Sequence, residues 1–385
     1  MKILHYIPTY APAWMWGGPV RSVSTLCEEL ARQGHDVTVF TTDAGLGPAD
    51  IPMRTAAVLR NGVKVHYYPR DPGFGIKSSA LEEAVRVRAK EFDLIHVTAI
   101  WQRTGTAACR AAWAAGVPYV ISPRGALGPY SWTRGTLKKL AYYFLHERRN
   151  LHTAAGFHYT SAMEKLECRR FRFGQACCIV ANGIDFQLWA RNEVSGAAWR
   201  QAGSMAAGDT VLLYAGRLHH KKGLDLLPSV LDKLQDENWV MAFVGKDEDG
   251  TGNRLQAEFS RRGLSSRVRF LPGVDPASLV AAYSGADVLV FPSAHENFGN
   301  VAVEAAACGC WVLASAQVGV AHELAALGAG ECLPRETAAW ATALDRWAGS
   351  SFGGNLLRNR LADAFDMKVT AEVMARFYET LLTER

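Results

Sequence analysis

The stretch Asp287-Val-Leu-Val-Phe-Pro-Ser-Ala-His-Glu-Asn-Phe-Gly-Asn-Val-Ala-Val-Glu304 changes from a strand pattern to a helix pattern. Its first part is a short apolar run that predicts a buried parallel strand ending at Pro292. After Gly299 the apolar spacing becomes helical. Strands that alternate with helices are typical of parallel sheets covered by helices. The pattern therefore places Glu296 in a strand-to-helix loop and Glu304 inside the helix.

These two glutamates suggest a ligand that carries many hydroxyl groups. A carboxylate on a helix as apolar as that of Glu304 is costly to bury unless it has a partner. Glu296 could reach the hydroxyls of a hexose at the end of the strand, and Glu304 could take the paired 2′ and 3′ hydroxyls of a ribose. A nucleotide-sugar has both groups in one molecule. The alternative is that both are ordinary charges near a helix start, where acidic residues are favoured anyway.

Three motifs carry a resemblance to a known family. The segment from Pro292 to Gly309 resembles the E-x7-E motif of retaining glycosyltransferases of family 4, which have the GT-B fold. Tyr214-Ala-Gly-Arg-Leu-His-His-Lys-Lys-Gly-Leu-Asp225 is similar to the G-R-x-x-x-x-K-G donor-phosphate segment of that family, and Val180-Ala-Asn-Gly-Ile-Asp185 to its N-G-V-D interdomain element. The resemblance covers most of the chain. It implies two Rossmann-like, doubly wound parallel-sheet domains that face a central cleft.

Arg217 and Lys222 are the candidate catalytic cations. They follow the predicted strand 211–216, at the point where a helix is expected to begin at Gly223. Two cations beside helix-start amides make a site for a diphosphate, whose negative charge grows as the glycosidic phosphate bond breaks. Arginine can grip two oxygens, whereas lysine acts as a point charge. A solvated turn is the alternative for Lys222, and it is the preferred interpretation of Lys221.

Two loops in the first half offer further contacts. Gly17 and Gly18 follow the first predicted strand and precede a helix over 21–32, so their backbone can approach a phosphate or sugar closely. Turns before helices often carry glycine, but the resemblance implies a Gly-Gly loop that lines the donor site. Arg124 follows the predicted strand 118–121, where the family often has a histidine. We expect Arg124 to contact donor sugar, phosphate or an anionic acceptor; a purely structural arginine is the alternative.

The predicted site combines these residues. The catalytic set is Arg217, Lys222 and Glu296, and the predicted contacts with the nucleotide-sugar, a co-substrate and not a resident cofactor, are Gly17, Gly18, Arg124, Asn297, Phe298, Gly299, Asn300 and Glu304. The residues single out neither a base for inversion nor a nucleophile for double displacement. The resemblance implies retention of anomeric configuration, with the departing diphosphate oxygen taking the acceptor's proton on the same face.

Composition sets the class of protein. A chain of 385 residues, 49% hydrophobic and 21% charged, fits two globular domains. No apolar stretch approaches the roughly 18 residues that span a bilayer, and the start of the chain has no signal-peptide pattern, so we expect a cytoplasmic protein. The eight cysteines show no metal-binding spacing, which indicates small buried side chains in a reducing compartment. No metal is predicted.

Strand and helix patterns divide the chain into two halves. Strands are predicted near 2–7, 36–41, 63–67, 93–97, 118–121, 156–160 and 177–180, and again near 210–215, 239–244, 267–270, 287–291 and 311–314. This predicts an acceptor-binding Rossmann-like domain over 1–185 and a nucleotide-sugar-binding one over 210–367. The polar segment 186–209 has no strong period and is predicted as the interdomain connection. The resemblance implies that a C-terminal helix over 368–385 packs back on the first domain.

Positive charge is concentrated between Trp132 and Arg172. This region contains nine basic residues and three glutamates, a surplus of six, whereas the whole chain has a formal net charge of +5. The basic residues are Arg134, Lys138, Lys139, Arg148, Arg149, Lys165, Arg169, Arg170 and Arg172. Lysines mixed with aromatic and aliphatic side chains are typical of a helix that lies against anionic lipid headgroups. The alternative is a core helix with a solvated basic face. No nucleic-acid recognition module accompanies the region.

The leading hypothesis is a retaining, metal-independent glycosyltransferase that moves a hexose to a saccharide or a polyprenyl-diphosphate-linked saccharide. With membrane contact, the acceptor would serve surface polysaccharide or glycolipid assembly at the inner face of the cytoplasmic membrane. A nucleotide-sugar epimerase or hydrolase of the same fold would bind the same donor. A nicotinamide-dependent oxidoreductase would also fit two α/β domains, but this chain has no G-x-G-x-x-G after its first predicted strand. A non-catalytic sugar-binding subunit would be expected to have lost one of the charged motif residues.

Overall fold

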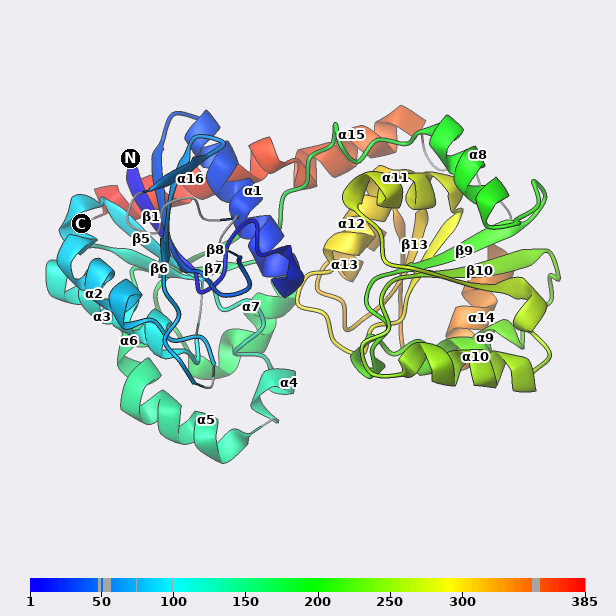
Figure 1. Ribbon diagram of the computed structural model, residues 1–385, viewed down its shortest axis with the longest axis horizontal. Helices are drawn as coiled ribbons and strands as arrows, with labels where there is room; N and C mark the ends of the chain where they lie inside the picture. The colour runs from blue at the N-terminus through cyan, green and yellow to red at the C-terminus, as the bar shows by residue number, and fades with distance from the viewer. Residues whose placement is uncertain are drawn as a thin grey trace. The chain divides into compact units, whose positions relative to one another are not determined.

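The computed structural model describes residues 1–47, 50, 57–73, 75–98, 100–133, 135–347 and 354–384. Within these ranges the chain forms two compact units, Met1–Gly183 with Met367–Arg385, and Ile184–Asp366. Each unit has a mainly parallel sheet with helices packed on it (Figure 1), so the predicted class of two doubly wound α/β domains is confirmed. Arg134 of the basic region and residue 385 of the predicted last helix lie outside the described residues.

The sheet of the first unit is built around its first strand. Its strands are β1 (Lys2–Tyr6), β2 (Asp36–Thr42), β3 (Val58–Arg60), β4 (Val63–Tyr68), β5 (Leu94–Val97), β6 (Tyr119–Ile121), β7 (Gly156–Tyr159) and β8 (Ala176–Ile179). They lie in the order β3-β4-β2-β1-β5-β6-β7-β8, and only β3 runs antiparallel to its neighbour. The direction of winding reverses between β1 and β5. In open α/β sheets, ligands bind beyond the carboxyl ends of the strands at such a reversal.

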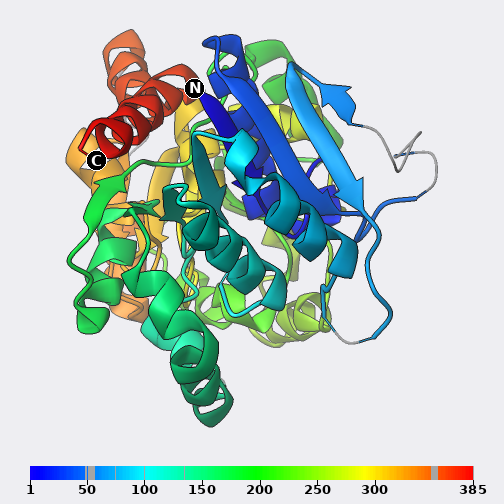
Figure 2. The ribbon, with the colours of Figure 1, turned by 90° about the vertical axis from the view of Figure 1, so that its left-hand side faces the viewer.

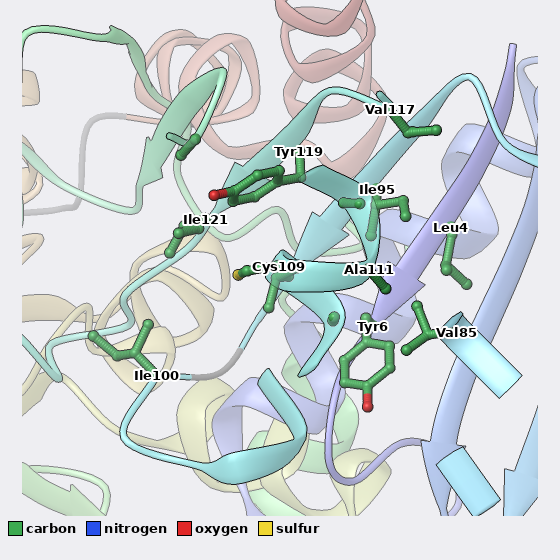
Figure 3. Packing of buried hydrophobic residues seen from close by; sticks show 14 of the residues in the cluster. Leu4, Tyr6, Val85, Ile95, Ile100, Cys109, Ala111, Val117, Tyr119 and Ile121 are labelled. Carbon is green, nitrogen blue, oxygen red and sulfur yellow. The ribbon is translucent and has the colours of Figure 1, made fainter. Parts of the chain in front are cut away.

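Alternating side chains of β1 serve two cores, one on each face of this sheet. Leu4 and Tyr6 belong to the core beneath α2 and α3, where Figure 3 shows them beside Ile95 and Val85. Ile3 belongs to the opposite core, which α1 and α16 cover, because successive strand residues point to opposite faces. The helices of this unit are η1 (Trp14–Trp16), α1 (Gly18–Arg32), α2 (Ser79–Arg88), η2 (Ala89–Glu91), α3 (Arg103–Ala115), α4 (Pro129–Trp132), α5 (Thr136–Tyr142), η3 (Tyr143–Glu147), α6 (Arg148–His152), α7 (Ala162–Cys168), η4 (Arg169–Phe171) and α16 (Met367–Thr383).

The second sheet is entirely parallel among the described residues. Its strands are β9 (Thr210–Ala215), β10 (Trp239–Val244), β11 (Val268–Leu271), β12 (Val288–Phe291), β13 (Trp311–Ser315) and β14 (Gly330–Leu333). They lie in the order β11-β10-β9-β12-β13-β14, which is the Rossmann order, with its reversal between β9 and β12. The helices are α8 (Glu193–Ala202), η5 (His220–Lys222), η6 (Leu224–Leu226), α9 (Leu227–Leu231), α10 (Thr251–Arg261), η7 (Ser265–Arg267), α11 (Pro276–Gly285), α12 (Asn300–Ala307), α13 (Ala321–Leu327), α14 (Thr337–Arg346) and α15 (Gly354–Phe365).

The segment 186–209 differs from the predicted connection because it belongs to the second unit. Its helix α8 packs against α11 so closely that a Cβ on Gly196 would come 2.7 Å from the backbone of Ser284. Arg200 binds Asp287, at the start of β12, with 2.6 Å between Nη2 and Oδ2. Val194, by contrast, is 83% exposed. With an exposed valine and with a glycine and an arginine in the contact, the sequence of α8 lacks the long apolar pattern that marks a buried helix.

Candidate functional site

Lys222 lies beyond the carboxyl end of β9, at the reversal of the second sheet. It ends the short turn η5, and Gly223 follows with a φ of +64°. A Cβ on Gly223 would come 2.3 Å from the carbonyl oxygen of Pro292. Only glycine therefore lets this segment pack on the end of β12, and that contact brings Lys222 next to the loop that holds Glu296.

Lys222 and Glu296 form a hydrogen-bonded ion pair. Their side chains are 18% and 28% exposed, so solvent screens the pair less than it screens a surface pair. The Lys222 ammonium also lies 5.9 Å from the ring centroid of Phe291. The structure thus brings together two of the three predicted catalytic residues, one from each side of the strand-order reversal.

Arg217 follows the same strand but has a different partner. Its Nη1 lies 3.1 Å from Oε2 of Glu248, and its side chain is 65% exposed. An exposed ion pair contributes little to stability, so Arg217 can exchange the carboxylate for phosphate oxygens at low cost. The sequence interpretation missed Glu248, although it follows β10, the neighbour of β9. The strand order would have revealed it.

The backbone on both sides of Glu296 is fixed. Its N–H donates to the carbonyl of Gln317 and its carbonyl accepts from the N–H of Gly319, both at 2.9 Å. These bonds join the loop after β12 to the loop after β13, so the Glu296 carboxylate is presented from a rigid position. The glutamate lies in a strand-to-helix loop, as the pattern predicts.

The residues between the two glutamates have different surroundings. Gly299 caps α12 with a φ of +98°, and a Cβ there would come 2.7 Å from Val318 Cγ1, so the position requires glycine. Asn297 and Asn300 are half-buried beside it. Phe298 is 3% exposed and packs against Phe365. Its side chain supports the loop from within, and the contact of Phe298 with the nucleotide-sugar stays a prediction, for which its backbone is available.

Glu304 is buried in the middle of α12, at 3% exposure. Its Oε2 accepts a hydrogen bond from the hydroxyl of Tyr283 on α11 at 3.3 Å. Burial, and then the charge of Glu304, raise the pKa of Tyr283 well above its usual range, so this phenol stays protonated and remains a donor. Tyr283 is the kind of partner that a buried carboxylate needs, and the sequence interpretation did not identify it.

In the first unit, Gly17 and Gly18 form the start of α1. Gly17 has a φ of +81°, a conformation that favours glycine, and Gly18 is the first residue of the helix. Within the described residues, no side chain caps this helix start and no acidic residue lies in its first turn. Pro19 has no N–H, and the N–H groups of Gly17 and Arg21 donate to backbone carbonyls, so Gly18 and Val20 supply the N–H groups of this helix start that could face an anion beyond the carboxyl end of β1.

Arg124 joins three elements of the first unit. Its Nη1 donates to Ser22 of α1 at 3.3 Å and to Asn182, near the end of the unit. With His158 it lines a cavity of about 10 Å³, which has room for about one water molecule. These contacts give Arg124 a structural role, which was the alternative left open by the sequence. Its contact with donor or acceptor stays a prediction.

Each unit matches one model of a known family. The first matches the glycosyl transferase 4-like domain over residues 17–183, and the second matches glycosyl transferases group 1 over residues 197–363. The chain belongs to the family 4 glycosyltransferases of the GT-B fold. The resemblance seen in the three motifs is thereby confirmed.

Several relatives of this glycosyltransferase have known names or structures. D-inositol 3-phosphate glycosyltransferase of Mycobacterium sp. (strain JLS) is 36% identical over 146 residues, which are 37% of this chain and 32% of that protein, so the match spans about a third of the relative. Glycogen synthase of Mycobacterium tuberculosis (strain ATCC 25618 / H37Rv) is 26% identical over 405 aligned positions, covering 98% and 94% of the two chains. HepE of Anabaena, solved in complex with UDP-glucose, has a TM-score of 0.74 and 19% identity over 99% and 100%, and shares the fold.

One group of described residues in the glycosyltransferase could hold a metal ion: His219, His220 and Asp249. His220 Nδ1 lies 2.7 Å from Asp249 Oδ2, and His219 Nε2 lies 3.9 Å from the same oxygen. Protein groups also satisfy this cluster, because the N–H of Lys221 donates to His219 Nδ1 at 3.1 Å and the Thr251 hydroxyl donates to Asp249 at 2.5 Å. The cluster lies close in sequence to the candidate phosphate cations, so the predicted independence from metals requires a direct experiment.

Proposed function

We propose that this glycosyltransferase moves a hexosyl group from a nucleoside-diphosphate sugar to an acceptor hydroxyl, with retention of anomeric configuration and without a metal ion. The pairing of Lys222 with Glu296 at the reversal of the second sheet carries the proposal. The cation suits a diphosphate oxygen and the carboxylate suits sugar hydroxyls. HepE of Anabaena, which shares the fold, was solved with UDP-glucose, and this supports the donor class.

The reaction would use Lys222 and Arg217 to stabilise the leaving group. As the bond between the sugar C1 and the diphosphate oxygen breaks, negative charge grows on that oxygen, where both cations can reach it. Lys222 exchanges its ion pair with Glu296 for the phosphate, which frees the Glu296 carboxylate to accept sugar hydroxyls. The departing oxygen takes the proton of the acceptor hydroxyl, and the acceptor oxygen bonds to C1 on the same face.

The acceptor in this proposal is a saccharide or a polyprenyl-diphosphate-linked saccharide used in surface polysaccharide or glycolipid assembly. The protein would work in the cytoplasm, with peripheral contact to anionic membrane through 132–172. None of the described helices has the length and apolar character needed to cross a membrane. The surplus of positive charge in the first unit supports contact with an anionic partner.

A donor screen tests the proposal directly. Thermal unfolding is measured with nucleoside-diphosphate hexoses that differ in base and sugar, and with a nicotinamide dinucleotide as control. A ligand at 100 times its dissociation constant stabilises the folded protein by about 2.7 kcal/mol. We expect the largest shift from a nucleoside-diphosphate hexose; a larger shift from the dinucleotide would overturn the donor class.

Product analysis then separates transfer from related reactions. Nuclear magnetic resonance of the product should show the donor's anomeric configuration in a new glycosidic bond that forms only when acceptor is present. An epimerised donor, or free sugar formed equally without acceptor, would identify an epimerase or a hydrolase. Turnover should be unchanged in EDTA. A loss that a divalent cation restores would overturn metal independence and point to the His219, His220 and Asp249 group.

A further inference from the structure

A row of large apolar side chains lies on the outer side of a continuous helical segment in the first unit. Helix α5 runs through the π-helical turn η3 into α6, at the periphery of the unit (Figures 1 and 2). Leu137, Leu140, Phe144 and Leu145 follow helical spacing, and they are 82%, 43%, 61% and 71% exposed. Contiguous exposed apolar patches are rare on monomers and mark interaction sites.

The inner side of the same segment is fixed by its own contacts. The Tyr142 hydroxyl lies 2.9 Å from Thr106 Oγ1, and the Tyr143 ring packs against Phe171 with 5.7 Å between centroids. Glu147 is 2% exposed and accepts from Thr106 at 3.0 Å. The outer row is therefore not a core face. A core helix with a solvated basic face does not account for this exposed apolar row.

Positive charge accompanies the apolar row. Lys138 and Arg148 are exposed, and the Arg149 guanidinium stacks on Trp113 at 4.0 Å from its ring centroid. Between residues 135 and 153 the only acidic residue in the sequence is Glu147, which is buried. The outer side thus combines apolar bulk with cations and has no exposed carboxylate within 135–153, the composition of a helix that lies in a membrane interface.

We propose that the outer side of α5, η3 and α6 is a docking surface for an anionic lipid bilayer. Leu137, Phe144 and Leu145 would enter the boundary between headgroups and acyl chains, and Lys138 and Arg148 would face lipid phosphates. The proposal deepens the proposed function, on which it rests, because it names the partner that presents a lipid-linked acceptor. Charge favours this partner over a second copy of the chain, whose own cations would repel the surface.

Vesicle sedimentation of the full-length protein tests the surface. Wild type is expected to sediment with phosphatidylglycerol–phosphatidylcholine vesicles, and to bind pure phosphatidylcholine vesicles at least about tenfold less, because each Lys or Arg near an anionic surface contributes about a factor of five. The triple variant Leu137→Ser, Phe144→Ser, Leu145→Ser should lower partitioning to anionic vesicles by at least about tenfold. The double variant Lys138→Glu, Arg148→Glu should lower it by about 25-fold or more.

Matched substitutions in the second unit provide the control. Val194 and Leu356 are 83% and 73% exposed, so Val194→Ser with Leu356→Ser removes exposed apolar side chains from another surface. This control is expected to bind vesicles like wild type. Equal binding to both vesicle types, or unchanged binding by the triple variant, would overturn the proposal. So would a wild-type dimer in analytical ultracentrifugation that the triple variant abolishes, since the surface would then join two copies.

The two proposals fail in different ways. Lys222→Ala should lose transfer yet sediment with vesicles like wild type, whereas the triple variant should lose vesicle binding yet keep transfer to a water-soluble acceptor. If wild type transfers no sugar but vesicle binding still depends on the apolar row, the docking surface stands and the proposed reaction falls. If transfer occurs and vesicle binding does not depend on the row, the docking surface falls.

Discussion

The two sheets share a strand order around their central strands, but their carboxyl ends carry cations in different surroundings. In the second unit, Lys222 and Arg217 each have a carboxylate partner, Glu296 and Glu248, and their side chains are 18% and 65% exposed. In the first unit, Arg124 is held by the neutral side chains of Ser22 and Asn182. Its further neighbours include the buried histidines His5 and His158 and the buried carboxylate of Glu164, which also accepts from the N–H of Gly125.

This difference suggests that the cations of the second unit take part in the reaction, whereas Arg124 of the first unit supports the fold. Arg217, in an exposed ion pair, can pass from a carboxylate to a phosphate at low cost, because such a pair contributes little. Lys222 leaves a less exposed pair with Glu296, so a phosphate must replace that carboxylate as its partner. Arg124 is partly buried, hydrogen-bonds to neutral side chains and lies near the buried Glu164 carboxylate, so it fixes the elements that it joins. We therefore expect charge changes to act on turnover and donor binding in the second unit, and on folding stability in the first.

The largest expected effect is on turnover. Lys222→Ala should lower kcat by about 100- to 1000-fold, which is typical for the loss of one group that stabilises developing charge. Initial rates of nucleoside-diphosphate release measure it, and circular dichroism checks the fold. Lys221→Ala is the matched control: this lysine is half-buried like its neighbour but is not assigned to the site, so turnover should stay within about twofold of wild type. A Lys222→Ala enzyme with more than half of wild-type turnover would remove this lysine from the mechanism.

Donor affinity should depend on the buried carboxylate of α12. Glu304→Gln keeps an oxygen for the Tyr283 hydroxyl but loses the charge that strengthens bonds to ribose hydroxyls, so the donor dissociation constant should rise by about 10- to 100-fold. Isothermal titration with the donor found in the screen measures this change. Tyr283→Phe is the control, because it keeps the carboxylate, and should change affinity by no more than about threefold. Wild-type affinity in Glu304→Gln would place the ribose elsewhere.

Sequence reasoning located the elements that have a clear period and missed those that lack one. The strand ending at Phe291 and the helix starting at Asn300 follow directly from apolar spacing. β3 is a three-residue edge strand, and β14 interrupts its apolar residues with Glu331, so neither has a run that marks it. Helix α8 was not predicted because its closest contact with α11 is made by Gly196, which adds no apolar side chain to the pattern.

The site was predictable where its residues lie in motifs. Glu296 and Lys222 were assigned to one site, and the structure pairs them. Glu248 and Tyr283 were missed because their contacts depend on which strands and helices are neighbours in space, and sequence distance does not show that. The outer row of α5 and η3 could be recognised only from the exposure of its side chains in the structure. The sequence pattern of Leu137, Leu140 and Phe144 fits a core face as well as a membrane-facing one.

The smallest expected effect concerns acid stability of the first unit. Burial, and then the charge of Arg124, lower the pKa of His5 to about 3, and the pKa of His158 is lowered to about 3 for the same reasons. Above pH 6.5 these histidines are neutral in both folded and unfolded chains. Below that pH only the unfolded chain takes up their protons, so stability falls as pH drops toward 3. Each such histidine should cost about 1.4 kcal/mol between pH 7.5 and 5.5.

His5→Leu isolates this contribution. Among the described residues, neither ring nitrogen of His5 has a hydrogen-bond partner, so an apolar side chain of similar size should cost little at pH 7.5. Urea unfolding at pH 7.5 and 5.5, with amide exchange of β1 as a second readout, should show a loss smaller than that of wild type by about 1.4 kcal/mol. His152→Gln, at an exposed position, should retain the full loss. If His5→Leu loses as much stability as wild type, the buried histidines are not what makes the first unit acid-sensitive, and the contrast drawn between the two sheets would no longer extend to their stability.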